Sequence, residues 1–413
     1  MPSSGPSIVV LSSLFPSAAQ PVAGVFIKER MRRVARELPL CVISPQPWFP
    51  LQGFIRLLRP NYRIPRPTAE LVDGLSVIRP RYLAFPSLFR RLDGLMMALA
   101  VRPHLRALKR IGRADVIDAH FVYPDGYAAA CLGRWLALPV AVTMRGTEPG
   151  HAMRPSLRPK LESALRAASR VICVSDSLRQ LALRLGAPTE RTCVIGNGVD
   201  LQNFAPIPSG EARAVLGIAP GATVLISVGG LVERKGFHRV IACLPQLLRR
   251  FPNLLYLIAG GPSAEGDWTD RLRDQVKRLD LERHVRFLGA VAPADLRVPL
   301  SAANVFVLAT RNEGWANVFL EAMACGLPVV TTRVGGNPEV VSGPDLGILV
   351  PFGDEDALRE GIAQAIERKW NTEGIRRYAE QNSWEQRVGS LVAEFRALAD
   401  AASQAPATQP AAA

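Results

Sequence analysis

Short apolar segments recur along the whole chain and are separated by amphipathic or basic stretches. In the first half, these segments are residues 8–13, 40–45, 115–120, 139–144, 170–175 and 192–197. In the second half, they are residues 223–229, 254–260, 285–290, 305–310, 329–332 and 347–350. Such runs indicate strands that are buried on both faces, with helices between them. The pattern therefore predicts an α/β fold with parallel sheets and right-handed crossovers.

The length of the chain favours two domains of similar size. Its 413 residues are too many for one ordinary core. Residues 205–222 are rich in Pro, Gly and Ala, which predicts an interdomain connection there. We therefore expect an N-terminal domain over residues 1–205 and a second domain over residues 206–375. Residues 401–413 lack periodicity and large apolar side chains, and we expect a disordered tail.

Membrane-spanning and metal-binding patterns are absent from the sequence. No apolar stretch is long enough to span a bilayer, and no basic region precedes the first apolar run as in a signal peptide. The six cysteines are scattered and form no CxxC pair, which indicates a reducing compartment and no structural zinc. The DxD pattern at 354–356 precedes a helical stretch and predicts a helix N-terminus instead of a metal site. We expect a cytoplasmic protein that binds no metal.

The most informative segment covers residues 310–332, which begin where an apolar strand ends. Glu313 lies in the expected loop, and Glu321 lies eight residues later in a predicted helix. The first turn of such a helix exposes backbone N–H groups that can bind an anion. One carboxylate could therefore lie near a sugar and the other near a ribose, with the amides at a diphosphate, as in a pocket for a nucleotide sugar. We expect donor-binding residues at Gly314, Trp315, Ala316, Asn317 and Val318. The alternative is two solvated glutamates, but the flanking glycines and the strand-loop-helix-strand order favour a site.

This segment resembles the E-x7-E motif of the family 4 retaining glycosyltransferases, which have the GT-B fold. Segments that resemble the family in the same order are 24–37, 118–130, 142–148, 171–180, 195–200, 227–237, 287–289, 334–339 and 382–388. The branch that it resembles most builds bacterial surface polysaccharides of the teichuronic acid or exopolysaccharide type. The resemblance implies two Rossmann-like domains whose parallel sheets face each other across a cleft. It also implies that residues 376–400 pack back on the N-terminal domain, and that no metal or other cofactor is needed.

A pair of cations follows the strand at 223–229. Arg234 and Lys235 lie in a turn before a predicted helix, where they could bind a diphosphate and stabilise the leaving nucleotide. An ordinary basic turn is the alternative. Many relatives have an arginine where Gly230 stands, so Arg234 is the candidate to replace it. The resemblance implies that Glu313 is catalytic at the donor sugar and that Glu321 binds the ribose.

Three residues of the N-terminal half gain a role through the resemblance. His120 ends an apolar strand, and the family places a catalytic histidine there, facing the reacting sugar; the alternative is a structural histidine. Arg145 ends the next strand, where many relatives have histidine, and could bind an anionic acceptor group or pair with Glu148. Gly24 would let the backbone approach the diphosphate, or would serve a simple turn.

The positive charge is concentrated near the N-terminus. The net charge is +14, and residues 28–113 contain 18 Lys or Arg but 5 Asp or Glu. Within 50–66 and 79–113 the arginines mix with aromatic and aliphatic residues, which fits either an anionic inner membrane leaflet or a solvated basic face. No recognised nucleic-acid motif is found, so nucleic acid is not an expected partner. The expected partners are a nucleotide-sugar donor and a saccharide or lipid-linked acceptor.

Two other functions compete with a glycosyltransferase. One is another enzyme of the same fold, a sugar phosphorylase or a nucleotide-sugar epimerase, although no segment suggests the pyridoxal lysine of a phosphorylase. The other is a basic protein that binds a membrane surface or nucleic acid without catalysis. The sequence does not identify the donor base, the donor sugar, the acceptor, the linkage or the oligomeric state.

Overall fold

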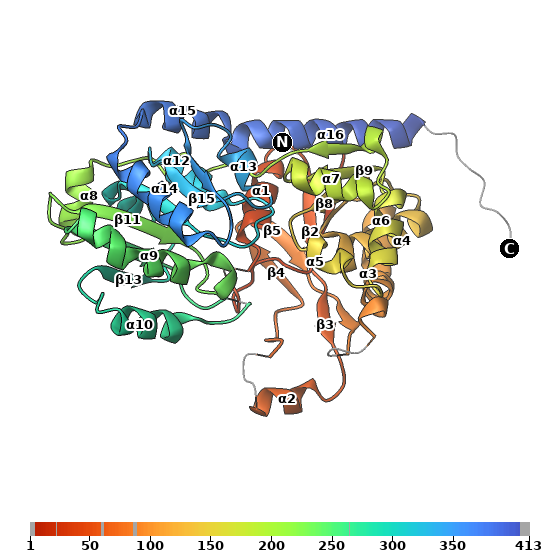
Figure 1. Cartoon of the computed structure of the whole chain (residues 1–413). Helices are drawn as coiled ribbons and strands as arrows, with labels where there is room; N and C mark the ends of the chain where they lie inside the picture. The colour runs from red at the N-terminus through yellow and green to blue at the C-terminus, as the bar shows by residue number, and fades with distance from the viewer. Residues whose placement is uncertain (1–4, 22, 59–61, 86–88, 264, 405–413) are drawn as a thin grey trace. The chain divides into compact units, whose positions relative to one another are not determined.

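The chain divides into two compact units. The computed structural model describes residues 5–21, 23–58, 62–85, 89–263 and 265–404 (Figure 1). Unit 1 combines the residues up to Asn197 with those from Arg387 onward, and unit 2 is the continuous segment Gly198–Gln386. Residues 205–222, where the sequence indicates a connection, lie inside unit 2 and contain helix α8 (Ser209–Val215). Unit 1 is therefore built from two separate segments of the chain.

An eight-stranded sheet of described residues forms the centre of unit 1. Its order is β10-β9-β8-β7-β1-β2-β5-β4, and only the edge pair β4–β5 is antiparallel within it. The expected parallel sheet is confirmed, and this edge pair departs from it, because Asp73 and Gly74 close a tight hairpin with positive φ. The strands are β1 (Ile8–Leu11), β2 (Leu40–Ile43), β4 (Ala69–Val72), β5 (Leu75–Ile78), β7 (Val116–His120), β8 (Val140–Met144), β9 (Arg170–Cys173) and β10 (Thr192–Val194).

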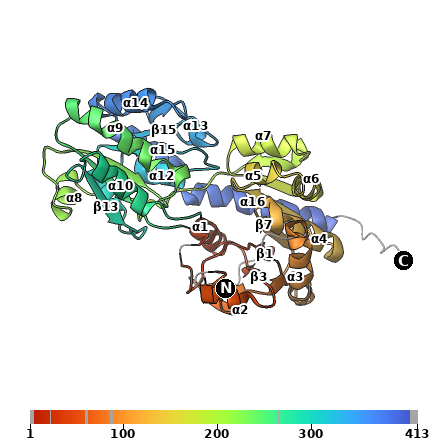
Figure 2. The ribbon, with the colours of Figure 1, turned by 60° about the horizontal axis from the view of Figure 1, so that its bottom comes forward.

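Helices cover this sheet. They are α1 (Val25–Val34), α3 (Asp93–Arg110), α4 (Tyr127–Leu136), α5 (Glu148–Ala152), α6 (Arg158–Ala167), α7 (Asp176–Arg184) and the long α16 (Trp384–Gln404), which starts in unit 2 and continues into unit 1. Figure 2 shows α3 and α4 side by side. Residues 401–404 continue α16, so the expected disordered tail does not start at 401, and 405–413 lie outside the described residues.

A smaller substructure extends unit 1. Strands β3 (Gln46–Trp48) and β6 (Arg81–Leu83) pair in parallel, and the short helix α2 (Gln52–Leu58) follows β3. Figure 1 shows α2 beyond β3, away from the eight-stranded sheet. Helix α2 has no buried residue, in contrast to the other α-helices of unit 1. Its apolar side chains therefore face outward.

Unit 2 contains a parallel six-stranded sheet among its described residues, in the order β13-β12-β11-β14-β15-β16. The strands are β11 (Thr223–Val228), β12 (Leu254–Ala259), β13 (Val285–Gly289), β14 (Val305–Leu308), β15 (Val329–Thr332) and β16 (Gly347–Val350). The remaining helices are α9 (Phe237–Arg250), α10 (Thr269–Arg278), α11 (Arg297–Ala302), α12 (Asn317–Ala324), α13 (Asn337–Val340), α14 (Glu355–Glu367) and α15 (Thr372–Gln381).

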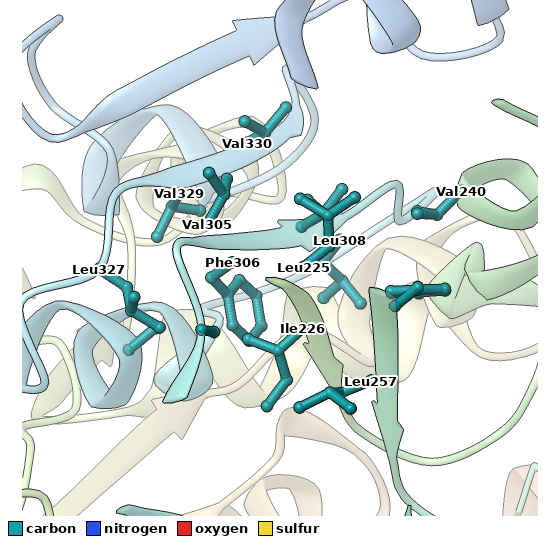
Figure 3. Close-up of a cluster of buried hydrophobic side chains, with 14 of the residues drawn as sticks. Leu225, Ile226, Val240, Leu257, Val305, Phe306, Leu308, Leu327, Val329 and Val330 are labelled. Carbon is teal, nitrogen blue, oxygen red and sulfur yellow. The ribbon is translucent and has the colours of Figure 1, made fainter. Parts of the chain in front are cut away.

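The centre of the unit 2 sheet places two strand ends next to each other. Leu225 and Ile226 of β11 pair with Val305 and Phe306 of β14, and all four side chains are buried. Figure 3 shows side chains of β11, β14 and β15 meeting in this core. Because parallel strands end at the same edge, the loops after β11 and β14 emerge together. These two loops carry the candidate donor site.

Neither a membrane span nor a metal cluster is found in the described part of the chain. No helix there is both long and apolar enough to cross a bilayer. No group of three or more His, Cys, Asp or Glu side chains could hold a metal ion there. Asp354 accepts a hydrogen bond of 2.8 Å from the backbone N of Ala357, so the DxD pattern caps α14 as expected.

Candidate functional site

The turn after β11 brings two cations to the edge of the unit 2 sheet. A short 3-10 turn, Glu233–Lys235, ends at Gly236, which has a φ of +78°. A Cβ atom at Gly236 would lie 1.9 Å from the carbonyl oxygen of Ala309, just after β14. Only glycine fits such a close approach with positive φ. The backbone itself thus holds Arg234 and Lys235 against the loop that follows β14.

Glu313 lies in that loop and is the centre of a compact polar cluster. Its Oε1 atom accepts hydrogen bonds from Lys235 Nζ at 2.7 Å, from Arg234 Nη1 at 3.1 Å and from Thr310 Oγ1 at 3.1 Å. The Glu313 side chain is 9% exposed. A carboxylate that is buried to this degree is stable when it is paired and hydrogen-bonded. The cations after β11 and the carboxylate after β14 therefore form one site. Arg234 and Lys235 lie 79 and 78 positions before Glu313 in the sequence.

Arg234 has a second acidic partner, Glu265. Two hydrogen bonds, from Nε at 2.8 Å and from Nη2 at 2.6 Å, join the guanidinium to this carboxylate. Nη1 also donates to the carbonyl oxygen of Asn312 at 2.7 Å. The hydrogen bonds from Arg234 lower the pKa of Glu265, and those to Glu265 raise the pKa of Arg234. Because Nε and Nη2 bind the two oxygens of one carboxylate, the plane of the guanidinium is fixed.

The N-terminus of α12 follows Glu313 directly. Its N-cap residue is Ala316, and no side chain caps the first turn. Gly314, Trp315, Asn317 and Val318 are partly exposed, whereas Ala316 is buried. Glu321 is half-buried in the next turn; burial raises its pKa to about 7, while the Lys235 cation opposes this shift. An uncapped first turn beside two cations has the electrostatics of an anion site.

His120 and Arg145 lie together in unit 1, at the ends of β7 and β8. Arg145 Nε donates a 2.9 Å hydrogen bond to His120 Nδ1, and His120 Nε2 lies 3.1 Å from Asp118 Oδ2. The His120 side chain is fully buried. Burial lowers the pKa of His120 to about 4, although the Asp118 carboxylate opposes this. The imidazole is therefore neutral at neutral pH, and protein groups surround both ring nitrogens.

Arg145 does not form the side-chain ion pair with Glu148 that was one sequence interpretation. The Glu148 carboxylate instead accepts hydrogen bonds from the backbone N–H groups of Arg145 at 3.2 Å and Gly146 at 2.7 Å. The Arg145 guanidinium donates to Asn197 Oδ1 at 3.1 Å and lies 5.1 Å from the centre of the Phe26 ring. It is held in place by residues of unit 1 alone.

Gly24 is the N-cap of α1, with a φ of +73°. A Cβ atom there would lie 2.5 Å from the carbonyl oxygen of Leu14. The simple turn is therefore present, and the close approach at Gly24 is to the loop after β1; an approach to a diphosphate stays a prediction.

Most of the sequence-based candidates group within their own units. Glu313, Arg234 and Lys235 meet in unit 2, and His120 meets Arg145 in unit 1. Residues that sequence reasoning missed are Thr310, Glu265 and Asp118, which complete the two clusters. Asp118 had a signal, because it is an acidic residue inside the apolar strand DVIDAH. Glu265 had none, since it lies in a polar loop with no pattern around it.

Comparisons with known proteins agree with the resemblance. A family described as "Glycosyl transferases group 1" matches residues 209–382, and one described as "Glycosyltransferase Family 4" matches residues 55–203. A D-inositol 3-phosphate glycosyltransferase of Kineococcus radiotolerans is 37% identical over 69% of this chain and 71% of that protein. The same enzyme of Geodermatophilus obscurus is 32% identical over 70% and 68%. TuaC of Bacillus subtilis, assigned to teichuronic acid biosynthesis, is 27% identical over 89% and 91%.

Solved structures of low sequence identity share the fold. Sucrose-phosphate synthase of Thermosynechococcus elongatus has a TM-score of 0.75 at 20% identity, covering 96% of this chain and 100% of that one. Anabaena HepE, in complex with UDP, has a TM-score of 0.74 at 23% identity, covering 95% and 100%. The two α/β units thus form the GT-B fold that the resemblance implies.

Proposed function

This chain belongs to the family 4 glycosyltransferases, and we propose that it is a retaining enzyme that uses a nucleotide-sugar donor. Unit 2 binds the donor and unit 1 binds a saccharide or lipid-linked acceptor. The product is part of a cell-surface polysaccharide, as teichuronic acid is for the relative TuaC. Relatives named as D-inositol 3-phosphate glycosyltransferases support an acceptor that bears a negative charge.

One observation carries this proposal: the pairing of Glu313 with Lys235 and Arg234 beside the uncapped start of α12. A diphosphate would find two cations and the N-terminus of a helix without a side-chain cap in one place. Glu313 then orients the cations and contacts the donor sugar, and Glu321 accepts hydrogen bonds from the ribose. Arg234 takes the place of the family arginine that is missing at Gly230.

In this proposal, the residues stabilise the negative charge that develops on the leaving group. During transfer, the bond between sugar C1 and the phosphate oxygen breaks, and its electron pair leaves with the nucleoside diphosphate. The acceptor oxygen forms the new bond to C1 on the same face, and its proton passes to the departing diphosphate oxygen. Lys235 and Arg234 stabilise the negative charge that develops there. These cations provide the positive charge that a divalent metal provides in other enzymes. Activity should therefore persist when a chelator is present.

In unit 1, the role proposed for Gly24 is the one that the family resemblance implies, a backbone that can approach a diphosphate. We assign His120 a positioning role, because it is fully buried and lies between Asp118 and Arg145. Arg145 is the residue of this cluster that we expect to meet an anionic acceptor group.

We also propose a peripheral location on the cytoplasmic face of the membrane. Three large apolar side chains of α2 are mostly exposed: Phe54 (68%), Leu57 (77%) and Leu58 (88%). Arg56 lies on the same short helix. Exposed apolar side chains with arginines suit an anionic bilayer surface. This surface would bring the enzyme to lipid-linked acceptors.

The experiment that tests the donor assignment is a binding and hydrolysis screen with UDP-, GDP- and ADP-sugars on wild type and Lys235→Ala. We expect one nucleotide to stabilise the wild type against heat, with the shift lost in the variant. The matched control is Arg311→Ala, an exposed cation of the loop after β14 that pairs with Glu233. Stabilisation that is equal in wild type and Lys235→Ala would refute the donor site. Membrane binding without any donor turnover would support the non-enzymatic alternative.

A further inference from the structure

A small arginine-lined cavity lies in unit 1 between β3, β6 and α2. Its volume is about 140 Å³, and its lining includes Trp48, Gln52, Arg56, Arg63, Arg66 and Arg81. Among the lining residues that the structure describes, none is acidic. Four cations around one cavity repel each other, so an arrangement of this kind is stabilised by an anion. None of the residues assigned to the donor site contributes to it.

Several polar atoms at this cavity lack a partner. Arg56 Nη1, Arg66 Nη1 and Gln52 Oε1 are buried and make no hydrogen bond within the described part of the chain. Buried polar atoms are nearly always hydrogen-bonded in folded proteins. The two guanidinium groups are donors, so their missing partner is an acceptor such as an anionic oxygen, whereas Gln52 Oε1 is an acceptor and needs a donor.

Two of the arginines are held in place by the protein. Arg63 Nη1 donates to the carbonyl oxygen of Ala84 at 2.7 Å, and its guanidinium lies 5.6 Å from the centre of the Phe49 ring. Arg66 Nη2 donates to Gln20 Oε1 at 2.8 Å. Guanidinium groups that are fixed before binding lose little rotamer entropy when they meet a ligand.

Nearby carboxylates are already paired elsewhere. Glu70 forms an ion pair with the buried Arg79, and Asp73 accepts a 2.6 Å hydrogen bond from Lys28. Among the described residues, no ion pair joins Arg56, Arg63, Arg66 or Arg81 to an acidic group. Burial and the Arg79 cation lower the pKa of Arg66, although the Glu70 carboxylate opposes this shift.

We propose that this cavity binds a phosphate group of the acceptor, with Trp48 packing against the group attached to it. The assignment to the acceptor rests on the proposed function, whereas binding of phosphate does not. A cavity of about 140 Å³ could hold roughly four waters or one tetrahedral anion. Arginine forks match the oxygens of a phosphate, two at a time. Such a phosphate could belong to a lipid headgroup or to a soluble sugar phosphate.

The test is a titration of the full-length protein with inorganic phosphate, followed by the fluorescence of Trp48. Trp48→Phe identifies the part of the signal that comes from this cavity. The variant Arg66→Gln/Arg81→Gln removes two of the lining cations. We expect it to weaken phosphate binding about tenfold or more. Lys235→Ala should leave this signal unchanged, because the residue lies at the donor site.

A matched control removes the same charge from another face of unit 1. Arg106 and Arg110 are exposed on α3, and Arg106→Gln/Arg110→Gln should bind phosphate as the wild type does. Equal weakening in both double variants would show general charge attraction and would overturn the proposal. So would wild-type affinity in Arg66→Gln/Arg81→Gln.

Two further arms separate the sources of the phosphate. Vesicles of phosphatidylcholine with phosphatidic acid represent the lipid headgroup, and a sugar 1-phosphate represents the soluble acceptor. If the wild type binds one of these ligands and Arg66→Gln/Arg81→Gln does not, the site is supported and the source of the phosphate is identified. Donor hydrolysis is measured in the same samples. Normal hydrolysis of the donor without phosphate binding overturns this inference alone. Phosphate binding without any donor turnover overturns the proposed function alone.

Discussion

Arg234 is joined to Glu265 by two hydrogen bonds of 2.6 and 2.8 Å, although the proposed role of Arg234 is to bind a diphosphate. Glu265 lies 31 residues later in the chain, and its side chain is 54% exposed. A donor diphosphate would compete with this carboxylate for the same guanidinium. Glu265 is therefore a negative charge placed next to the site where another negative group must bind.

Replacing Glu265 by Gln should strengthen donor binding. The change removes the competing charge but keeps a side chain of the same shape. We expect the donor KM to fall about two- to fivefold, with little change in kcat, since an exposed pair contributes about 1 kcal/mol or less. Steady-state kinetics with the donor found in the nucleotide screen will measure this. A rise in KM would instead show that Glu265 is needed to orient Arg234.

Glu321 should give donor binding a pH dependence near neutrality. Burial raises the pKa of Glu321 to about 7, so this carboxylate, for which we propose ribose binding, is largely protonated at about pH 6 and ionised at about pH 8. We expect donor affinity to rise with pH through this range. Titration calorimetry at several pH values will show the rise in wild type. Glu321→Gln should flatten the curve; an unchanged curve in this variant would assign the pH dependence to another group.

Asp125 should lower the stability of unit 1 as pH rises. The side chain is fully buried, accepts hydrogen bonds from Ser13 N and from Ser13 Oγ, and burial raises its pKa to about 7. The folded protein thus keeps this proton at pH values where the unfolded chain has released it. Stability falls between the ordinary carboxyl pKa and about 7, by at most about 1.4 kcal/mol per pH unit.

Asp125→Asn should remove that loss, because the amide stays neutral and Ser13 can both donate to it and accept from it. We expect the variant to match wild type in urea unfolding at about pH 5 and to be more stable at about pH 8. Asp125→Ala is the control: it leaves Ser13 unpartnered and should cost about 1–3 kcal/mol at both pH values. A variant Asp125→Asn that is less stable than wild type at high pH would contradict this explanation.

Gly236→Ala should disturb both stability and donor binding. The added Cβ would meet the Ala309 carbonyl oxygen at 1.9 Å and would force an L side chain into positive φ. We expect a loss of about 1–3 kcal/mol of stability and a weaker donor complex, since this turn carries Lys235. Gly221→Ala is the matched control, because nothing lies within 4 Å of its added Cβ. Equal melting temperatures of the two variants would argue against strain at Gly236.

The sequence predicted the central strands well, since each of the twelve apolar runs contains a strand of the structure. The strands missed were β3, β4, β5 and β6, which are short or half-exposed and so lack a continuous apolar run. The β4–β5 hairpin had a local signal, the Asp73-Gly74 pair between two apolar segments. The small substructure of β3, β6 and α2 had none, because its strands are three residues long.

The candidate site was predictable where one short segment contains most of it. Glu313, Glu321 and the start of α12 lie within nine residues, so local pattern and family resemblance located them together. The burial of His120 was not predictable. Its environment is set by Asp118, two residues earlier on the same face of β7, and by Arg145 after the next strand of the sheet. Such long-range electrostatics depend on tertiary packing that one sequence does not specify.

The division of unit 1 into two chain segments has a consequence for the order in which the protein is made. Helix α16 contributes Leu391 and Phe395 as fully buried residues, and Glu394 pairs with Arg170 of β9. Unit 2 leaves the ribosome as one continuous piece, whereas unit 1 waits for the last part of the chain. During synthesis, unit 2 can therefore be complete while unit 1 still lacks the segment from Arg387 onward, and we expect activity only once that segment has been made and has packed.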